Sequence, residues 1–193
     1  MYTHHTQQKG FTLVETLVAV TVLLLAIVGP MVVAARGFQS AYFAREQMAA
    51  VFLAQEALEA VVQLRDDTAL DVVWGTGTDT WDWFDNGPIP SQCRTGSQTC
   101  DYNALDGTFH LCSGSSCLLH ENQNPLSNNI LYAYGSGSDW IDSIYTREIS
   151  FEEEESAQEL TVTVTVTWPS NIYGQHASDA SVVLQTRIFN QYE

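Results

Sequence analysis

The sequence predicts an α+β protein in which a long N-terminal α-helix packs on a C-terminal antiparallel β-sheet. Residues 11–35 form one apolar run, and a helical pattern continues from it to about residue 67. Residues 68–143 are rich in loop-forming residues, and residues 144–193 contain three stretches in which apolar and polar residues alternate. Alternation with a period of two is typical of strands with one buried face, which are common in antiparallel sheets.

The composition excludes two broad classes of protein. The chain has 193 residues, of which 45% are hydrophobic, and its formal net charge is −16, from 7 basic and 23 acidic residues. The hydrophobic content excludes a chain that is disordered throughout. The excess of carboxylates makes the chain a poor partner for nucleic-acid phosphates, so we expect no nucleic-acid partner.

The apolar run of residues 11–35 is long enough to cross a membrane, because about 20 helical residues span the hydrocarbon core. A secretory signal peptide fits less well, since its apolar region has about 7–15 residues and a cleavage site follows promptly. A plain signal anchor is the other alternative, but neither explains the charge of Glu15 within the run. Basic residues flank the run on both sides, at Lys9 and Arg36, so charge bias does not set its orientation.

Glu15 has two interpretations. Thr12 and Glu15 have the spacing of a capping box, which would place the carboxylate at the positive end of the helix dipole. Alternatively, a cut before Phe11 would create an α-ammonium group four residues away. A carboxylate in lipid would pair with such a group, in its own chain or in a neighbour, because a buried charge is stabilised by an opposite charge.

The segment KGFTLVE, residues 9–15, resembles the class III signal peptide of type IV pilins and type II secretion pseudopilins. This resemblance implies that a prepilin peptidase cuts after Gly10 and that the new N-terminal residue, Phe11, becomes N-methylated. It also implies that Glu15 engages the amino terminus of an adjacent subunit during assembly.

The same resemblance implies a life cycle. A leader of residues 1–10 would be removed, and residues 11–35 would hold the chain in the inner membrane, N-terminus cytoplasmic, before it joins a cell-surface filament. The implied partners are prepilin peptidase, the inner-membrane assembly platform, membrane lipid and other pilin subunits. The implied function is that of a structural subunit, a minor pilin, and not of an enzyme. A type II secretion pseudopilin and a pilus-tip adhesin are the alternatives.

Residues 36–67 predict the amphipathic second half of the helix. Before it, Gly29 and Pro30 interrupt the apolar run, so we expect a kink or local melting there. The resemblance to pilins implies that the helix melts at this point when a filament packs. Beyond Arg36, apolar residues at steps of three and four form a stripe: Ala50, Leu53, Ala57, Val61 and Leu64. Polar residues fall on another face: Gln55, Glu56, Glu59 and Gln63.

The variable loop region, residues 68–143, is rich in Gly, Ser, Asn and Asp, which predicts loops with a few short strands. It contains four cysteines: Cys93, Cys100, Cys112 and Cys117. Their spacing favours disulfides over zinc, because zinc ribbons use C-x2-C pairs, so we expect no metal site at the cysteines. Three connectivities are open, and we favour the two local pairs. Disulfides agree with an exported head.

Other residues of the loop region are candidates for binding. Exposed aromatic residues could form a sugar- or receptor-binding platform, but more often they fill the core beneath long loops: Trp74, Trp81, Trp83, Phe84 and Trp140. A loose acidic cluster could ligate Ca²⁺, but without EF-hand spacing we favour solvated charge: Asp66, Asp67, Asp71, Asp79, Asp82 and Asp85. Three histidines lack a nucleophile or paired metal spacing and are expected to be ordinary surface or loop residues: His110, His120 and His176.

The C-terminal region, residues 144–193, predicts the antiparallel sheet. The expected strands are Ile144–Phe151, Leu160–Trp168 and Ser181–Phe189, and residues 152–155 are expected to form a solvated acidic turn. In the second strand one face is apolar and the other consists of threonines. The apolar face needs a cover, which the helical stripe can supply. The order of helix, variable loop and sheet resembles the pilin fold.

Overall fold

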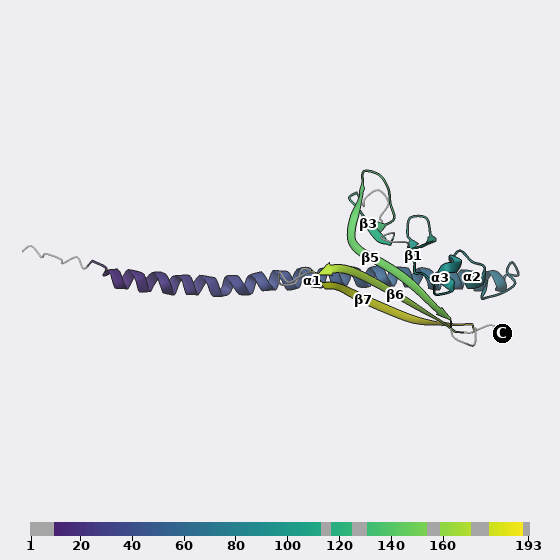
Figure 1. Cartoon of the computed structure of the whole chain (residues 1–193), viewed down its shortest axis with the longest axis horizontal. Coiled ribbons are helices and arrows are strands. Elements are labelled where there is room, and N and C mark those ends of the chain that lie inside the picture. The colour runs from purple at the N-terminus through teal and green to yellow at the C-terminus, as the bar shows by residue number, and fades with distance from the viewer. Residues whose placement is uncertain (1–9, 113–116, 125–130, 154–158, 171–177, 191–193) are drawn as a thin grey trace, which may run out of the picture. The chain divides into compact units, whose positions relative to one another are not determined.

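The computed structural model describes residues 10–112, 117–124, 131–153, 159–170 and 178–190. It confirms the α+β class, with a long N-terminal helix, an antiparallel sheet and two disulfides in the loop region (Figure 1). The chain divides into two compact units, residues 1–44 and residues 45–193. The long helix contributes to both, and only its part beyond residue 44 is described here as packing on the sheet.

Helix α1 spans Leu13–Val73. It begins after Thr12, whose Oγ1 accepts a hydrogen bond from the backbone N–H of Glu15 at 3.3 Å, which is one of the two bonds of the predicted capping box. The chain remains helical through Gly29 and Pro30, and the kink or melting expected at this point stays a prediction.

The end of α1 corrects the sequence analysis, which ended the helix near residue 67. Residues 68–73 contain no glycine or proline and remain helical to Val73. The first residue that breaks the pattern is Gly75, which adopts a φ of 78°. Its N–H donates to the carbonyl of Val72 at 3.1 Å, and the N–H of Thr76 donates to that of Asp71 at 2.9 Å. A glycine in the left-handed region with such bonds is a common helix terminator.

The second half of α1 packs on the sheet through the predicted stripe. The buried residues of the helix are Ala50, Leu53, Ala54, Ala57 and Val61. Three of these are alanines that are 0% exposed, so the helix backbone lies close to the sheet. Leu64, the last member of the predicted stripe, is only half-buried.

The three predicted strands form the main part of the sheet. They are β5 (Trp140–Glu153), β6 (Glu159–Ser170) and β7 (Ser178–Phe189), each longer than predicted. β6 pairs antiparallel with both β5 and β7. The strands contribute the buried apolar side chains Tyr145, Ile149, Phe151, Leu160, Val162, Val164, Val166, Trp168 and Ile188.

The loop region contains short elements that extend this sheet. They are α2 (Asp82–Asp85), α3 (Ser91–Arg94), β1 (Cys100–Asn103), β2 (Thr108–Leu111), β3 (Leu118–Asn122) and β4 (Tyr132–Ala133). The strand order is β2-β1-β5-β3-β4, and β6 and β7 follow on the other edge of β5. β5 is therefore the central strand, because it pairs with β1 and β3 as well as with β6.

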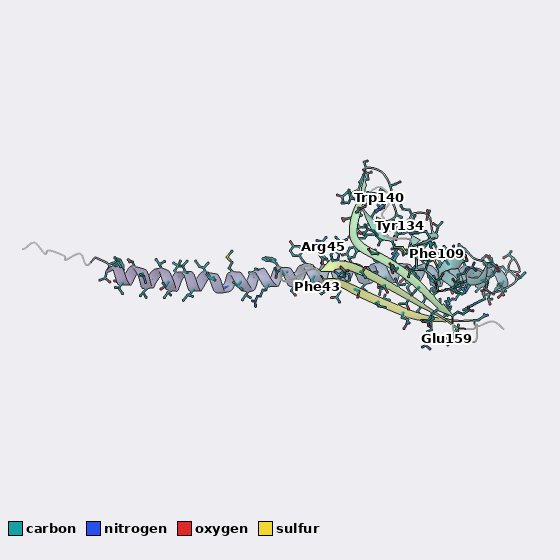
Figure 2. All side chains as sticks on the ribbon, in the orientation of Figure 1. Phe43, Arg45, Phe109, Tyr134, Trp140 and Glu159 are labelled. Atoms are coloured by element: carbon teal, nitrogen blue, oxygen red, sulfur yellow. A yellow bond between two sulfur atoms is a disulfide. The ribbon has the colours of Figure 1, made fainter. Side chains whose placement is uncertain are left out.

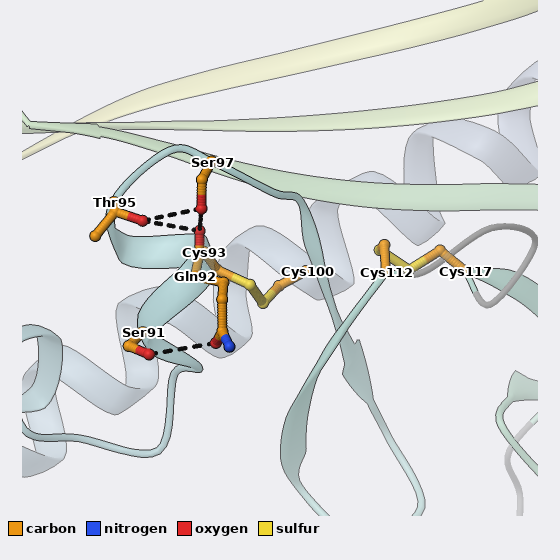
Figure 3. Close-up of a disulfide and its surroundings, with 8 residues drawn as sticks. All are labelled: Ser91, Gln92, Cys93, Thr95, Ser97, Cys100, Cys112 and Cys117. Carbon is orange, nitrogen blue, oxygen red and sulfur yellow. Dashed lines mark hydrogen bonds between the residues drawn. A yellow bond between two sulfur atoms is a disulfide. The ribbon is translucent and has the colours of Figure 1, made fainter.

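Two disulfides pin the loop region, and they are the two local pairs favoured from the sequence (Figure 3). Cys93–Cys100 joins α3 to the first residue of β1. Cys112–Cys117 joins the segment after β2 to the residue before β3. Each bond thus anchors a short strand of the sheet to a neighbouring segment.

Candidate functional site

The fold does not require a small residue at position 10, just before Phe11. A Cβ atom added at Gly10 would meet no atom within 4 Å, and no positive φ is recorded there. Phe11 is 80% exposed. Because the fold itself places no demand for glycine at position 10, any requirement for it comes from a molecule that handles this segment.

Glu15 is exposed, in the first turn of α1. Among the residues that the structure describes, none forms an ion pair with its carboxylate. The Thr12 bond engages only the backbone N–H of Glu15. A carboxylate in an apolar segment without a partner carries an energetic penalty, so Glu15 is available to a positive group from outside the described chain.

The remaining polar groups of this segment are satisfied within the helix. The hydroxyls of Thr16 and Thr21 donate to the carbonyls of Leu13 and Val18, at 2.9 and 2.8 Å. Internal bonding of this kind is what a lipid environment requires, since lipid offers no partner.

The apolar side chains of α1 from Leu13 to Val33 are exposed and stand out all around the helix (Figure 2). By length and composition, α1 can cross a membrane, and its most apolar window has a mean hydropathy of 2.8 with none of it buried. An apolar helix surface of this size needs lipid or other protein to cover it.

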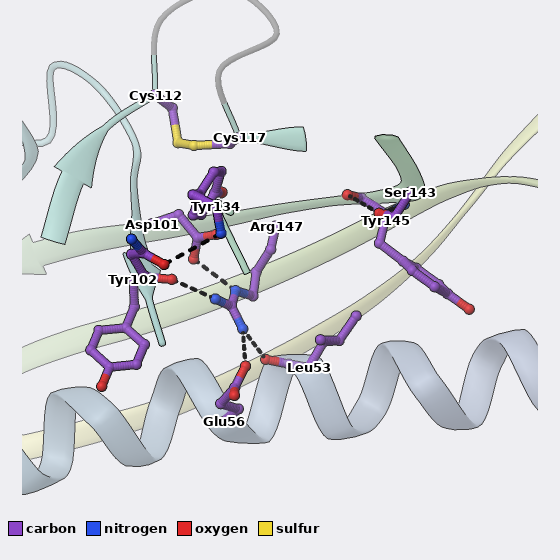
Figure 4. Close-up of polar contacts among 11 residues, drawn as sticks. Leu53, Glu56, Asp101, Tyr102, Cys112, Cys117, Tyr134, Ser143, Tyr145 and Arg147 are labelled. Atoms are coloured by element: carbon purple, nitrogen blue, oxygen red, sulfur yellow. Dashed lines mark hydrogen bonds and ion pairs between the residues drawn. A yellow bond between two sulfur atoms is a disulfide. The ribbon is translucent and has the colours of Figure 1, made fainter. Parts of the chain in front are cut away.

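The second compact unit, residues 45–193, is called the head below. It contains a buried ionic network that the sequence did not predict (Figure 4). Arg147 of β5 is 0% exposed. Its Nε donates to Asp101 Oδ1 at 2.7 Å, and its Nη1 donates to Glu56 Oε2 at 2.6 Å. Two backbone carbonyls accept further bonds from the guanidinium, those of Leu53 at 3.1 Å and Tyr102 at 2.6 Å. One side chain therefore ties the helix, β1 and β5 together.

A second layer supports this network. The hydroxyl of Tyr134 donates to the other carboxylate oxygen of Asp101. Burial and the charge of Asp101 raise the pKa of Tyr134 well above its ordinary value. Burial alone would lower the pKa of Arg147, but the carboxylates of Asp101 and Glu56 outweigh it and raise that pKa. The guanidinium is therefore charged at every physiological pH.

The sequence does contain a signal for this network. Arg147 lies between Tyr145 and Ile149 in an alternating strand, at a position on the face that becomes buried. An arginine at such a position requires buried acceptors. Its partner Asp101 is 46 residues away, in the loop region, and no local pattern connects the two.

Three of the five candidate aromatic residues confirm the favoured prediction of core filling and do not form a binding platform. Trp81, Trp83 and Phe84 are between 1% and 5% exposed and contact one another with ring centroids 5.6–6.2 Å apart. They therefore fill the core beneath the loops. Trp140 is half-buried, and its ring lies so close to Gly135 that a Cβ there would meet it at 2.0 Å. Only Trp74, which is 76% exposed, is fully presented to solvent.

The acidic cluster is spread over local contacts. Asp66 pairs with Arg65 at 2.6 Å, Asp71 accepts from Thr76 at 3.3 Å, and Asp79 accepts from the N–H of Trp81 at 2.8 Å. Across the described ranges, no group of three or more His, Cys, Asp and Glu side chains could hold a metal ion. Solvated charge stays the prediction for these residues, and a Ca²⁺ site stays the less favoured alternative.

The histidines differ from the expected surface residues. His110 is half-buried in β2 and contacts Tyr134 edge to face, with ring centroids 4.1 Å apart. His120 in β3 is half-buried, and its Nδ1 lies 2.6 Å from the carbonyl oxygen of Gly135. His176, Glu154 and Glu155 lie outside the described residues.

Comparison with protein families gives one finding. Residues 5–29 match the model of the prokaryotic N-terminal methylation motif, the class III signal peptide of type IV pilins. No curated protein and no solved structure matches the chain. The matched range contains Gly10, Phe11 and Glu15. The fold of the described chain gives no reason for these three residue types at these positions. The motif therefore supports a type IV pilin-like or pseudopilin precursor and a structural role.

Proposed function

We propose that this chain is a minor structural subunit of a type IV pilus-like filament. A prepilin peptidase cuts it after Gly10 and Phe11 is N-methylated, while residues 11–35 hold it in the inner membrane with its N-terminus cytoplasmic. The inner-membrane assembly platform then passes it into the filament, where its apolar helix packs against the helices of other subunits. The observation that carries this proposal is the methylation motif at residues 5–29, which continues into an uncovered apolar helix.

In this proposal, the apolar part of helix α1 lies first in lipid and then among the helices of other subunits. Lipid covers the apolar residues of α1 before assembly, and neighbouring helices cover them afterwards. Glu15 is a poor fit to lipid and a good fit to a neighbour that offers a positive amino terminus, so its charge favours assembly. The acidic head remains in solvent and is held to the helix by the sheet and the buried Arg147 network.

A type II secretion pseudopilin would carry the same motif. The disulfide-pinned loop region favours the pilus subunit, since a subunit displayed outside the cell benefits from cross-linked loops. The tip-adhesin alternative loses most of its aromatic platform, because Trp81 and Trp83 are buried. Its one exposed candidate is Trp74.

The test is to shear filaments from the cell surface and to probe them for this protein, with mass spectrometry of its amino terminus. We expect a mature chain beginning at N-methylated Phe11 and present at a low ratio to another subunit. A chain that retains residues 1–10, or that is absent from all sheared filaments, would contradict the proposal.

A glycine variant sharpens this test. Gly10→Val should leave uncut precursor in the membrane, because the fold has space for the new side chain and only the peptidase would reject it. Gly37→Val is the matched control, since a Cβ at Gly37 also meets nothing within 4 Å, and we expect it to be cut normally. A mature amino terminus at Phe11 in the Gly10 variant would count against cleavage by a glycine-specific peptidase.

A further inference from the structure

Helix α1 ends in a cluster of apolar side chains that are exposed to solvent. Leu70, Val73 and Trp74 are 49%, 69% and 76% exposed. The N–H of Trp74 donates to the carbonyl of Leu70 at 2.9 Å, so the helical turn continues to Trp74. Residues three and four apart on a helix are neighbours on one face, so the three side chains lie together. Single exposed apolar residues are common on protein surfaces, whereas a cluster of them is typical of a contact surface.

A small cavity lies beside this cluster. Its volume is about 80 Å³, several times what a single water needs, so it has room for the end of a side chain. It lies between the last turns of α1, the residues that precede α2 and the end of β7 (Figure 1). The residues that line it are Arg65, Asp66, Ala69, Thr80, Trp81, Phe189 and Asn190.

The cavity and the exposed cluster adjoin each other. Ala69 of the cavity directly precedes Leu70 and lies one helical turn before Val73. Phe189 of the cavity is itself 50% exposed. Leu70, Val73, Trp74 and Phe189 are therefore called the apolar patch below. A patch of large apolar side chains next to a pocket is the arrangement on which protein–protein contacts concentrate their binding energy.

Carboxylates flank the apolar patch on the helix. Asp66 and Asp67 lie one turn before Leu70, Asp71 follows it directly, and all three are exposed. The Nε and Nη2 of Arg65 both donate to Oδ1 of Asp66, at 2.8 and 2.6 Å. No described residue forms an ion pair with Asp67 or Asp71. The patch is therefore bordered by negative charge, of which Arg65 neutralises only a part.

This charge narrows the chemistry of the occupant. Apolar surface bordered by carboxylates is complementary to apolar side chains that are accompanied by lysine or arginine. The anionic phosphates of a lipid surface would be repelled. A second copy of this chain is a poor source of positive charge, because the whole chain has 7 basic residues and 23 acidic ones. Three of its arginines already form ion pairs within the head: Arg65, Arg147 and Arg187.

We propose that the apolar patch docks a basic and apolar segment of a different protein. Apolar side chains of that partner cover Val73 and Trp74, and one of them enters the cavity at Ala69. Its lysines or arginines pair with Asp67 and Asp71. The proposal goes beyond the filament function, because it concerns the head alone and requires neither the cut after Gly10 nor the apolar run.

The two parts of the surface contribute differently to such a contact. Burial of Trp74 supplies affinity, because large aromatic side chains at the centre of an interface carry much of its binding energy. The carboxylates lie at the rim and stay partly solvated, so they supply orientation and a faster encounter with a positive partner. Removal of Trp74 should therefore weaken the contact more than removal of two rim charges.

The test is site-specific cross-linking in intact cells that make this chain naturally. All four native cysteines are paired, so Val73→Cys adds a single free thiol, to which a maleimide with a photoreactive group is attached. Leu70→Cys is a second attachment site. Val183→Cys is the matched control, since Val183 is also an apolar residue of the head and is 57% exposed, on β7. We expect positions 70 and 73, but not 183, to join a different protein at a segment that contains lysine or arginine.

Substitutions in the Val73→Cys chain test the chemistry of the contact. Trp74→Ala should lower the yield of the cross-link by roughly tenfold or more. Asp67→Asn with Asp71→Asn should lower it by roughly fivefold, because two rim charges are lost. Glu152→Gln with Glu153→Gln is the matched control. It removes the same charge from two exposed residues of β5 and should leave the yield unchanged.

Several outcomes would overturn the proposal. These are a cross-link that joins only copies of this chain, only lipid or glycan, or nothing at either attachment site. A partner segment without lysine or arginine, or an aspartate variant that matches the glutamate control, would overturn it as well. The measurement reads the chain in whole cells, so it gives a result whether or not the chain enters filaments. Absence of the wild-type chain from sheared filaments would overturn the filament function and would not alter this result.

Discussion

Glu15 is the one charged residue of the apolar run at residues 11–35, and its part in the proposed function is argued from that position. Its carboxylate sits in an exposed apolar helix, in the first turn, and only its backbone is engaged by Thr12. Lipid disfavours the carboxylate, while the positive end of the helix and a neighbouring amino terminus favour it. In the proposed function, the residue would therefore raise the free energy of the membrane-held state relative to the assembled state.

We expect Glu15→Ala to insert into the membrane and to be cut after Gly10, but to be recovered from sheared filaments at roughly a tenth of the wild-type level or less. Insertion should not suffer, because removing a carboxylate from lipid is favourable by as much as about 2.5–3.5 kcal/mol. Immunoblots of membrane and filament fractions measure both steps. Thr16→Ala, one residue away, is the control and should assemble, and equal recovery of the two variants would remove Glu15 from the assembly step.

Arg147 illustrates the opposite case, a charge whose partners all lie within the head. Arg147→Leu should lower the free energy of unfolding by about 3–5 kcal/mol, because it leaves the buried Asp101 carboxylate without its counter-charge. Arg187→Leu is the matched control. Its ion pair with Glu159 is exposed on the arginine side, so the expected loss is about 0–1 kcal/mol.

Urea unfolding of the full chain in detergent measures this difference, with the fluorescence of the buried residues Trp81, Trp83 and Trp168 as the signal. Equal midpoints for the two arginine variants would show that the buried network contributes no more than a surface pair.

At the scale of elements, the two disulfides hold parts of the chain that have little secondary structure of their own. Helix α3 has four residues and β1 has four, so neither is stable without a cross-link or extensive packing. Cys93 and Cys100 are both 0% exposed, whereas Cys112 of the second disulfide is half-buried.

We expect replacement of Cys93 and Cys100 by serine to lower the free energy of unfolding by more than replacement of Cys112 and Cys117. Loop-closure entropy contributes about 2 kcal/mol for each of these short loops. The first pair loses more, because both of its serine hydroxyls would be buried. Thermal unfolding of the two double variants in detergent compares them, and a larger loss for the second pair would contradict the argument.

The elements with a regular period were predictable from the sequence, and the irregular ones were not. The threonine–valine alternation of β6 and the stripe of α1 each depend on one repeating period, so the pattern reports the buried face directly. The helix end was missed because Asp66, Asp67 and Asp71 resemble a loop, although Leu70 and Val73 continue the helix. The short strands of the loop region follow from pairing with β5, which no local pattern encodes.

The residues of the candidate site were likewise predictable where the signal is local and not predictable where it depends on distant parts of the chain. The motif at Gly10, Phe11 and Glu15 is local, so the sequence alone was enough to single it out. The Arg147–Asp101 pair joins residues from two distant regions, and its geometry exists only once the sheet has formed. Burial of Trp81 and Trp83 likewise depends on how the loops fold back over the core, which composition does not report.

The whole chain consists of an apolar N-terminal helical segment, residues 11–35, followed by an acidic head. The proposed cut after Gly10 would remove Lys9 and no acidic residue, so the formal charge of the proposed mature chain would be 6 − 23 = −17 before the new amino terminus is counted. Apart from Glu15, the acidic residues all lie beyond residue 45. Repulsion between such heads favours solubility and limits contacts between copies to surfaces where opposite charges meet.

Alkaline pH should destabilise this acidic head through its buried tyrosines. Burial, with a smaller effect from Tyr132 and Glu46, raises the pKa of Tyr145 from its ordinary value of 10.0 to about 12, and the pKa of Tyr134 is raised further. The folded state therefore holds its tyrosine protons more tightly than the unfolded state. The resulting stability is fully present below pH 10 and is lost as the pH rises towards the folded-state pKa of each tyrosine.

The expected result is a midpoint of thermal unfolding that is constant near neutral pH and falls steadily above about pH 10. At about pH 11, Tyr145 alone should account for about 1 kcal/mol of the loss, or roughly 3 °C for a chain of this length. Tyr145→Phe should remove that share of the pH dependence, because phenylalanine fills the same space and does not ionise. Tyr42→Phe, at an exposed position on α1, should leave the pH dependence unchanged. If the Tyr145 variant and the wild type lose stability in parallel as the pH rises, ionisation of Tyr145 is not coupled to unfolding. The loss of stability at alkaline pH must then come from repulsion among the carboxylates and ionised tyrosines of the head as a whole.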